Sequence, residues 1–145
     1  MIVLHKDEAF LSYCRQLLDQ FAEDTNGVNY VFIATADGFD VASKILNFSE
    51  TYGNQDKLAA VASSIMALGI SLAGEFGLQN CRTVTVDSDT GKITLRPINT
   101  IHQSFILLIQ SGSDGLLGHI LHGANKITEA LMTKAEEYGP VSTEH

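Results

Sequence analysis

The sequence has few of the residues that cross-link or rigidify a chain: no tryptophan, two prolines and two cysteines in 145 residues. Cys14 and Cys81 lie far apart and each falls within an apolar pattern, so neither a disulfide framework nor a zinc site is indicated. Such cysteine usage is typical of a reducing compartment. Charged residues also occur within the first eight positions, before the apolar run of a signal peptide. We therefore expect a cytoplasmic protein.

Basic residues are also scarce: nine lysines and arginines stand against seventeen aspartates and glutamates, a formal charge of −8. Phosphate backbones and anionic lipid surfaces are bound through clusters of lysine and arginine, so the composition argues against nucleic acid as a partner and against membrane insertion. A chain of this length buries one core and not two. We expect a single domain over residues 1–137 and a flexible tail over residues 138–145, around Pro140.

Catalytic motifs are absent from the sequence. It holds neither the G-x-x-x-x-G-K-[ST] loop that cradles nucleotide phosphates nor the G-x-S-x-G nucleophile elbow. Gly112, Gly115 and Gly118 follow a predicted strand and open a predicted helix, but their spacing does not fit a dinucleotide fingerprint. A strand-to-helix turn capped by Ser113 or Asp114 explains them more simply. We expect no catalytic residue and no cofactor, and hence no enzyme.

Two pairs of residues carry weaker chemical signals. His119 and His122 are one helical turn apart, which suits a shared metal ion, but no carboxylate or cysteine stands nearby in sequence to complete the site. Arg82 and Arg96 suit the role of an arginine finger towards a partner's phosphate. As strand residues they are more simply solvent-facing charges that discourage edge pairing. We therefore expect a polar helix face, two exposed arginines and no metal site.

The most unusual stretch runs from Leu58 to Gly74, seventeen consecutive residues without a charge. At 100° per residue, one side of a helix here carries the stripe expected of a helix lying on a core, namely Leu58, Val61, Ile65, Leu68 and Leu72. A second apolar stripe lies beside it: Ala59, Ala62, Met66, Ile70 and Ala73. In a chain this small, a helix that is apolar around more than half its circumference indicates a surface covered by a second chain.

Two other interpretations of this helix stay open. A membrane-spanning helix needs about 20 predominantly apolar residues, and this run is shorter, with three serines and two glycines. An alanine-rich helix half exposed in a monomer is also compatible, because small side chains face water at little cost. We favour homotypic packing, in which small side chains let a second helix come close, with Met66 and Ile70 as the largest anchors.

Periodicity and turn signals predict three helices and five strands. The expected helices cover Asp7 to Glu23, the central apolar stretch, and Leu117 to about Glu137. The expected strands cover Tyr30 to Ala36, Phe39 to Lys44, Cys81 to Asp87, Lys92 to Arg96, and Phe105 to Ile109. The fold class is therefore α+β: a single five-stranded, mostly antiparallel sheet with flanking helices, in the order α-β-β-α-β-β-β-α.

Local signals place the strands more closely. Asp37-Gly38 is a hairpin signal between the first two strands, and Pro97 is expected to end the fourth by removing a donor. The fifth strand is apolar without alternation, so both of its faces should be covered in the middle of the sheet. Residues 45–54 show no period and are expected to form a mobile connection, with Asn54 as the N-cap of the central helix.

In their order and spacing, four segments resemble the roadblock family, the dynein-light-chain-like domains. These segments are the first hairpin, IATADGFDVAS from Ile33; the helix LAAVASSIMALGISLAGEFG; the strand pair RTVTVDSDTGKITLRPI from Arg82; and FILLIQSGSDGLLGHI leading into the last helix. The match covers roughly Val28 to Leu131. The resemblance implies a homodimer or heterodimer in which the central helices pair and the Cys81 to Asp87 strands join edge to edge into one ten-stranded sheet.

The resemblance also implies a function without a catalytic constellation. Members of the family act as platforms that bind Ras-like small GTPases; some bacterial homodimers speed GTP hydrolysis without inserting an arginine, and others only scaffold. We therefore expect a homodimeric adaptor that binds and regulates a Ras-like small GTPase. The predicted dimer interface combines the second apolar stripe with the threonines of the third strand: Ala59, Ala62, Met66, Ile70, Ala73, Thr83 and Thr85.

Two rival functions come from other classes. A five-stranded antiparallel sheet flanked by helices also suits small-molecule pockets, so the chain is alternatively a small-molecule-sensing regulatory module. The other rival is a metal-dependent enzyme that uses His119 and His122.

Overall fold

A computed structural model describes residues 3–47 and 54–139 of the chain. A short 3-10 helix, η1 (Leu4–Lys6), precedes three helices: α1 (Glu8–Asp24), α2 (Gln55–Glu75) and α3 (Leu117–Glu136). The strands are β1 (Val28–Thr35), β2 (Asp40–Ile45), β3 (Val84–Ser88), β4 (Gly91–Asn99) and β5 (Ser104–Gly112). They form one sheet in the order β2-β1-β5-β4-β3, and each neighbouring pair is antiparallel. The predicted fold class and element order are confirmed.

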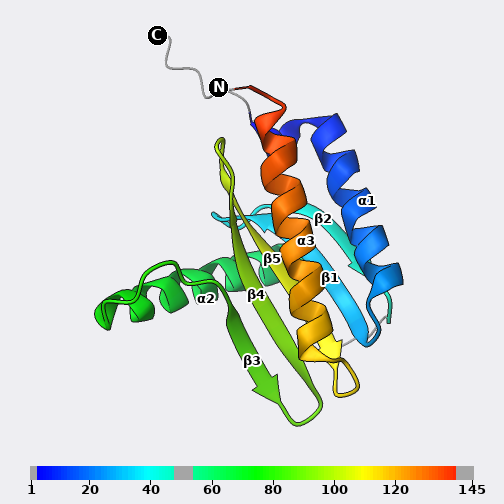
Figure 1. The fold of residues 1–145 in the computed structure, drawn as a ribbon, viewed down its shortest axis with the longest axis vertical. Coiled ribbons are helices and arrows are strands. Elements are labelled where there is room, and N and C mark those ends of the chain that lie inside the picture. The colour runs from blue at the N-terminus through cyan, green and yellow to red at the C-terminus, as the bar shows by residue number, and fades with distance from the viewer. Residues whose placement is uncertain (1–2, 48–53, 140–145) are drawn as a thin grey trace.

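The sheet is the middle of three layers. Helices α1 and α3 lie side by side on one face, and α2 crosses the opposite face (Figure 1). Successive residues of a strand point to opposite faces, so the three inner strands β1, β5 and β4 each contribute to two separate hydrophobic clusters. Strand β5 lies at the centre with both faces covered, as its unbroken apolar run predicted.

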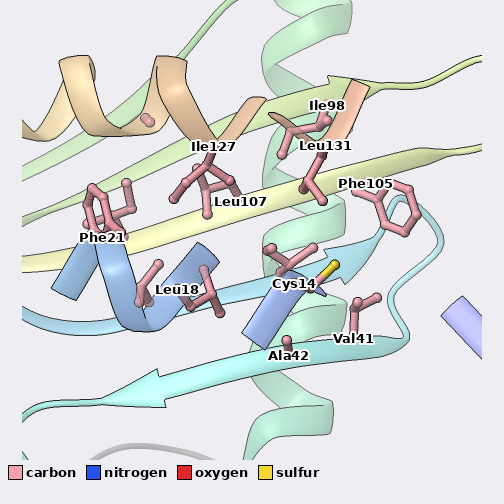
Figure 2. Close-up of a cluster of buried hydrophobic side chains, with 14 of the residues drawn as sticks. Cys14, Leu18, Phe21, Val41, Ala42, Ile98, Phe105, Leu107, Ile127 and Leu131 are labelled. Atoms are coloured by element: carbon pink, nitrogen blue, oxygen red, sulfur yellow. The ribbon is translucent and has the colours of Figure 1, made fainter. Parts of the chain in front are cut away.

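The larger cluster fills the space between the sheet and the helix pair. Helix α1 contributes Cys14, Leu18 and Phe21, and these face Leu107 of β5 (Figure 2). Helix α3 contributes its apolar stripe, every member of which is buried: Ile120, Ala124, Ile127, Leu131 and Ala135. Burial raises the pKa of the Cys14 thiol to about 12, so this cysteine is a core residue that stays protonated at neutral pH.

Helix α2 closes the second cluster on the opposite face. Ala59, Ala62 and Met66 are buried against β1, β4 and β5, where they meet aromatic and aliphatic side chains such as Phe32 and Leu95. Two polar contacts fix the helix further. The Tyr30 hydroxyl donates to Gln55 Oε1 at 2.7 Å, and Ser63 Oγ donates to the Ala36 carbonyl at 2.5 Å.

The strand predictions hold with one error and one shift. The first hairpin turns at Asp37-Gly38 as predicted, with Gly38 at φ 97°. Pro97 does not end β4, which pairs with β5 as far as Asn99. Strand β3 reaches only to the level of Leu95, so β4 has a free edge beside Pro97, and an edge tolerates a residue without an N–H. Because β3 begins at Val84, Cys81 to Thr83 lie outside the sheet, and the third strand begins three residues later than predicted.

The helix ends give one confirmation and one correction. Asn54 is the N-cap of α2 as predicted, because its side chain accepts from the Lys57 N–H at 2.8 Å. Helix α3 instead begins after Leu116, whose side chain cannot cap, so the predicted cap by Ser113 or Asp114 is wrong. Most of the predicted mobile connection, residues 48–53, lies outside the described residues.

Tyr138, the first residue of the predicted tail, lies within the part of the chain that the structure describes. Tyr138 packs against the larger cluster, and its hydroxyl donates to Asp7 Oδ2 at 2.5 Å. Asp7 is also the N-cap of α1, where it accepts from the Phe10 N–H at 2.8 Å. One carboxylate therefore joins the start of α1 to the end of α3. Residues 140–145 lie outside the described residues.

The joint between α1 and α3 predicts a pH dependence. The hydrogen bonds from Tyr138 and Phe10 lower the pKa of Asp7, so its contribution to stability is present above the unfolded value near 3.9 and is lost as pH falls through the folded value. Burial and the bond to Asp7 raise the pKa of Tyr138 to about 12. Unfolding therefore becomes easier between about pH 10 and 12, where only the unfolded tyrosine ionises.

Tyr138→Phe should remove both effects while keeping the ring. We expect a lower thermal midpoint at pH 7 and flatter profiles below pH 4 and above pH 10, measured by circular dichroism. The matched control is Tyr13→Phe, because the Tyr13 hydroxyl makes no hydrogen bond to any described residue. Parallel profiles for wild type and Tyr138→Phe would show that the joint does not form in solution.

Candidate functional site

Helix α2 crosses the whole sheet and continues past its edge. It crosses β3 at Gly69, where an added Cβ would lie 2.6 Å from Cγ2 of Val84. Only a residue without a side chain permits this approach. The last turns of α2 then lie beyond β3, away from the rest of the chain (Figure 1). We call this segment, residues 70–78, the α2 overhang.

The α2 overhang and the turn before it are strongly apolar and exposed. The exposed fraction is 69% for Leu68, 50% for Ile70 and 62% for Leu72. It reaches 76% for Phe76 and 65% for Leu78, just after the helix. Contiguous apolar surface of this kind is uncommon on a monomer and marks a surface that another molecule covers.

The predicted roles of the two α2 stripes are partly exchanged in the structure. Ala59, Ala62 and Met66 were predicted to meet a second chain, but they are at most 2% exposed against the sheet of their own chain. Of the stripe predicted to face the core, Val61, Leu68 and Leu72 are exposed instead, whereas Leu58 and Ile65 are partly buried against the same cluster. The stripe that contains Ala59 and Ala62 packs on the sheet because its small side chains let the helix backbone come close.

The second half of the predicted interface has a different environment. Ile70 and Ala73 continue the sheet-facing stripe, but they lie beyond Gly69, where the sheet has ended. Ile70 is therefore half exposed and Ala73 only partly buried. Of the predicted helix residues, these two remain available to a second chain.

Strand β3 supplies a free edge beside the overhang. Within the described residues it pairs only with β4, so one row of its backbone N–H and C=O groups has no strand partner. Thr85 lies within β3 and is exposed. Thr83 lies before the strand, and its hydroxyl accepts from Arg96 Nη2 at 3.1 Å. The structure thus places the predicted threonines beside the overhang, one of them already engaged within the chain.

Arg96 is held within the chain and is not a free, solvent-facing charge. Besides Thr83, its guanidinium donates to Oδ1 of Asn125 on α3. Burial and then the nearby charge of Arg82 lower the pKa of Arg96. Arg82 itself is exposed, as predicted. Because Arg96 bonds to both Thr83 and Asn125, it helps to position α3 over β4. These contacts leave it poorly placed to reach into a partner.

The start of α2 carries a carboxylate pair that the sequence did not reveal. Burial, and then repulsion from and a hydrogen bond with Asp56, raise the pKa of Asp40. The two residues are sixteen positions apart, so only the folded hairpin brings them together. Two carboxylates this close repel each other when both are ionised, which is unfavourable at the N-terminal end of α2.

By length and composition α2 is also apolar enough to cross a membrane. Three observations favour a helix of a water-soluble interface instead. Its N-terminal half is packed on the sheet through three buried residues. Asp56 and Lys57 occupy its first turn, and Glu75 its last. Lipid cannot surround a helix that already covers a sheet.

His119 and His122 lie elsewhere, in a groove of about 540 Å³ between α1 and α3. Among the described residues, no group of three histidine, cysteine or acidic side chains stands close enough to hold a metal ion. Helices α1 and α3 lie on the face of the sheet opposite α2 (Figure 1), so the groove that they line lies on that face too. It therefore forms a second surface, separate from the overhang.

The crossing at Gly69 gives a direct test of where α2 lies. Gly69→Ala places a methyl group against Val84, whose branched side chain has little freedom, at a cost of about 1–3 kcal/mol. Gly74→Ala in the same helix is the control, because an added Cβ there has no neighbour within 4 Å. Both gain similar helix propensity, so Gly69→Ala should be the less stable by that difference in urea unfolding. Equal stabilities would place α2 away from β3.

Comparisons with known proteins agree with this geometry. The sequence pattern of the Roadblock/LC7 domain family matches residues 15–111. Myxococcus xanthus MglB is similar in structure, with a TM-score of 0.79 at 15% identity, covering 99% of this chain and 100% of that chain. An MglB with a tetrameric arrangement gives 0.76 at 19% identity, with 88% and 90% covered.

A Roadblock/LC7 domain from Streptomyces avermitilis has a TM-score of 0.71 at 16% identity, with 83% of this chain and 95% of that chain covered. No curated protein matches the sequence. At these identities the solved structures show a shared fold, whereas the family pattern spans well over half of the chain. The resemblance found in the sequence is thereby confirmed, and the chain belongs to the roadblock/LC7 family.

Proposed function

We propose that the protein is a homodimeric roadblock-type adaptor of the cytoplasm that binds and regulates a Ras-like small GTPase. The observation that carries the proposal is the α2 overhang beside the free edge of β3, in a chain of this family. Its work is binding and not chemistry, since the surface that the fold leaves uncovered is apolar, and Arg96 is engaged within the chain.

The dimensions of the overhang support pairing with a second copy. From Ile70 to its C-cap Phe76 the helix advances about 9 Å at 1.5 Å per residue. Two strands added to the edge of a sheet span a similar distance, about 10 Å. Two copies joined through β3 would therefore each supply strands beneath the other's overhang. The sheet-facing stripe would then continue over a continuous sheet, with Ile70 and Ala73 buried in the same way as Met66.

The proposed interface keeps part of the sequence prediction and replaces the rest. Ile70, Ala73 and Thr85 stay, and Leu68 and Leu72 join them from the opposite side of the helix. The similar MglB with a tetrameric arrangement is a family member that self-associates. That arrangement is consistent with an apolar surface large enough for more than one copy.

Solution mass tests the dimer. By light scattering the wild type should have a mass of about 31 kDa, twice the 15.7 kDa chain. Ile70→Glu with Leu72→Glu should give a folded monomer, because each buried unpaired charge costs about 3 kcal/mol or more, at least ~100-fold in dissociation constant.

The control variant carries the same two new charges on exposed apolar residues of the opposite layer, Leu116→Glu with Met132→Glu. It should remain dimeric, and circular dichroism checks that all three proteins are folded. A monomeric wild type, or a dimeric Ile70/Leu72 variant, would contradict the interface. A wild type that sediments with lipid vesicles would also contradict it, since lipid would then cover α2.

Binding of a GTPase is tested separately. Ras-like small GTPases from the same genome are loaded with GDP or with a non-hydrolysable GTP analogue and titrated with the dimer by calorimetry. We expect one of them to bind with at least ~10-fold preference for one nucleotide state, about 1.4 kcal/mol. The rate of GTP hydrolysis with and without the dimer then separates an activator from a scaffold. No binding in either state would refute the GTPase role and leave the dimer standing.

A further inference from the structure

The groove between α1 and α3 is a second hollow surface, on the opposite side of the sheet from α2. It has a volume of about 540 Å³ and runs along the C-terminal half of α1 and roughly the first four turns of α3. Its floor is apolar and contains Leu17, Phe21, Ile127 and Ala130. Pockets of 300–1,000 Å³ with an apolar lining and a few polar groups are typical small-ligand sites.

The floor of the groove is fixed by one close contact between the helices. A Cβ added at Gly123 would lie 2.4 Å from Cε1 of Phe21, so α3 rests directly on the Phe21 ring. Phe21 is 4% exposed, and it lies beside Ile127 in the larger cluster (Figure 2). Because Ala130 is also small, the groove stays open above this contact. The hollow is therefore part of the packed structure, built on rigid helices.

The walls of the groove differ in charge. His119, His122 and Lys126 line the α3 side, and none has an ion pair or hydrogen bond with any described residue. On the α1 side the single acid, Asp24, accepts from Gln20 Nε2 at 3.0 Å. The donors on the α3 side are thus unpaired, while Asp24 keeps its charge and accepts from a neutral amide on the α1 side. In a chain of net charge −8, the α3 side of the groove is where an anion would find free donors.

We propose that this groove binds a small amphipathic anion, a carboxylate with an apolar body of about ten carbons. The apolar part lies on Phe21, Ile127 and Ala130, and the carboxylate accepts from Lys126 and the two histidines. The site lies on the opposite side of the sheet from the proposed dimer surface. It gives the protein a ligand-binding activity of its own.

The test uses decanoate as the probe, with decanol and decyltrimethylammonium of equal chain length, below their micelle concentrations. Binding is followed by amide chemical shifts in nuclear magnetic resonance. We expect decanoate to bind at least 10-fold more tightly than the cation, with shifts confined to residues 17–25 and 119–130. Shifts on the α2 overhang instead, no binding, or equal affinity for the three probes would overturn the proposal.

Variants separate the site from unspecific charge effects. Lys126→Glu should weaken decanoate binding at least 10-fold, whereas Lys6→Glu, the same charge change at an exposed residue outside the groove, should not. Ala130→Phe fills the hollow and should abolish binding of all three probes, with circular dichroism checking the fold. If decanoate fails while an acidic helical peptide shifts the same residues, the groove is a protein-docking site and the small-ligand proposal is wrong.

Discussion

The close packing of α2 on the sheet is the contact on which the architecture of this protein depends. Ala59 and Ala62 bring the helix backbone down onto the sheet, and Gly69 lets it pass over Val84 at the edge. A helix of larger residues would stand further from the strands, where it could not cross the edge so closely. Because the crossing occurs at Gly69, with six helical residues still to come, the fold exposes an apolar segment that one chain cannot cover.

The two faces of the sheet consequently differ in how completely the chain covers them. The face under α1 and α3 is closed, with the helices joined at one end by the hydrogen bond from Tyr138 to Asp7 and held together near the other by the contact between Gly123 and Phe21. The α2 face is incomplete at β3. The groove above Phe21 lies on the rigid side, so a ligand there would not compete with a partner on α2.

The exchanged stripes of α2 show where reasoning from the sequence stops. Both stripes are apolar, and periodicity gives their angular separation without saying which one meets the sheet. The stripe that begins at Leu58 was expected to face the core, but the close approach of α2 to the sheet favours the stripe with the smaller residues Ala59 and Ala62. The predictions that Pro97 ends its strand and that Ser113 or Asp114 caps α3 failed for a similar reason, because they depend on how far β3 extends and on how β5 leads into α3.

The sequence by itself determined the element order, the central place of β5, the N-cap of α2 and the family, because these follow from local period, turn chemistry and the spacing of segments. The tertiary structure alone decided which side of α2 is free, that Arg96 is bound between β4 and α3, and that His119 and His122 line a groove with α1. Each of these depends on distances between segments far apart in the chain. Such distances are set by how side-chain volumes fill the space between layers, which no local pattern encodes.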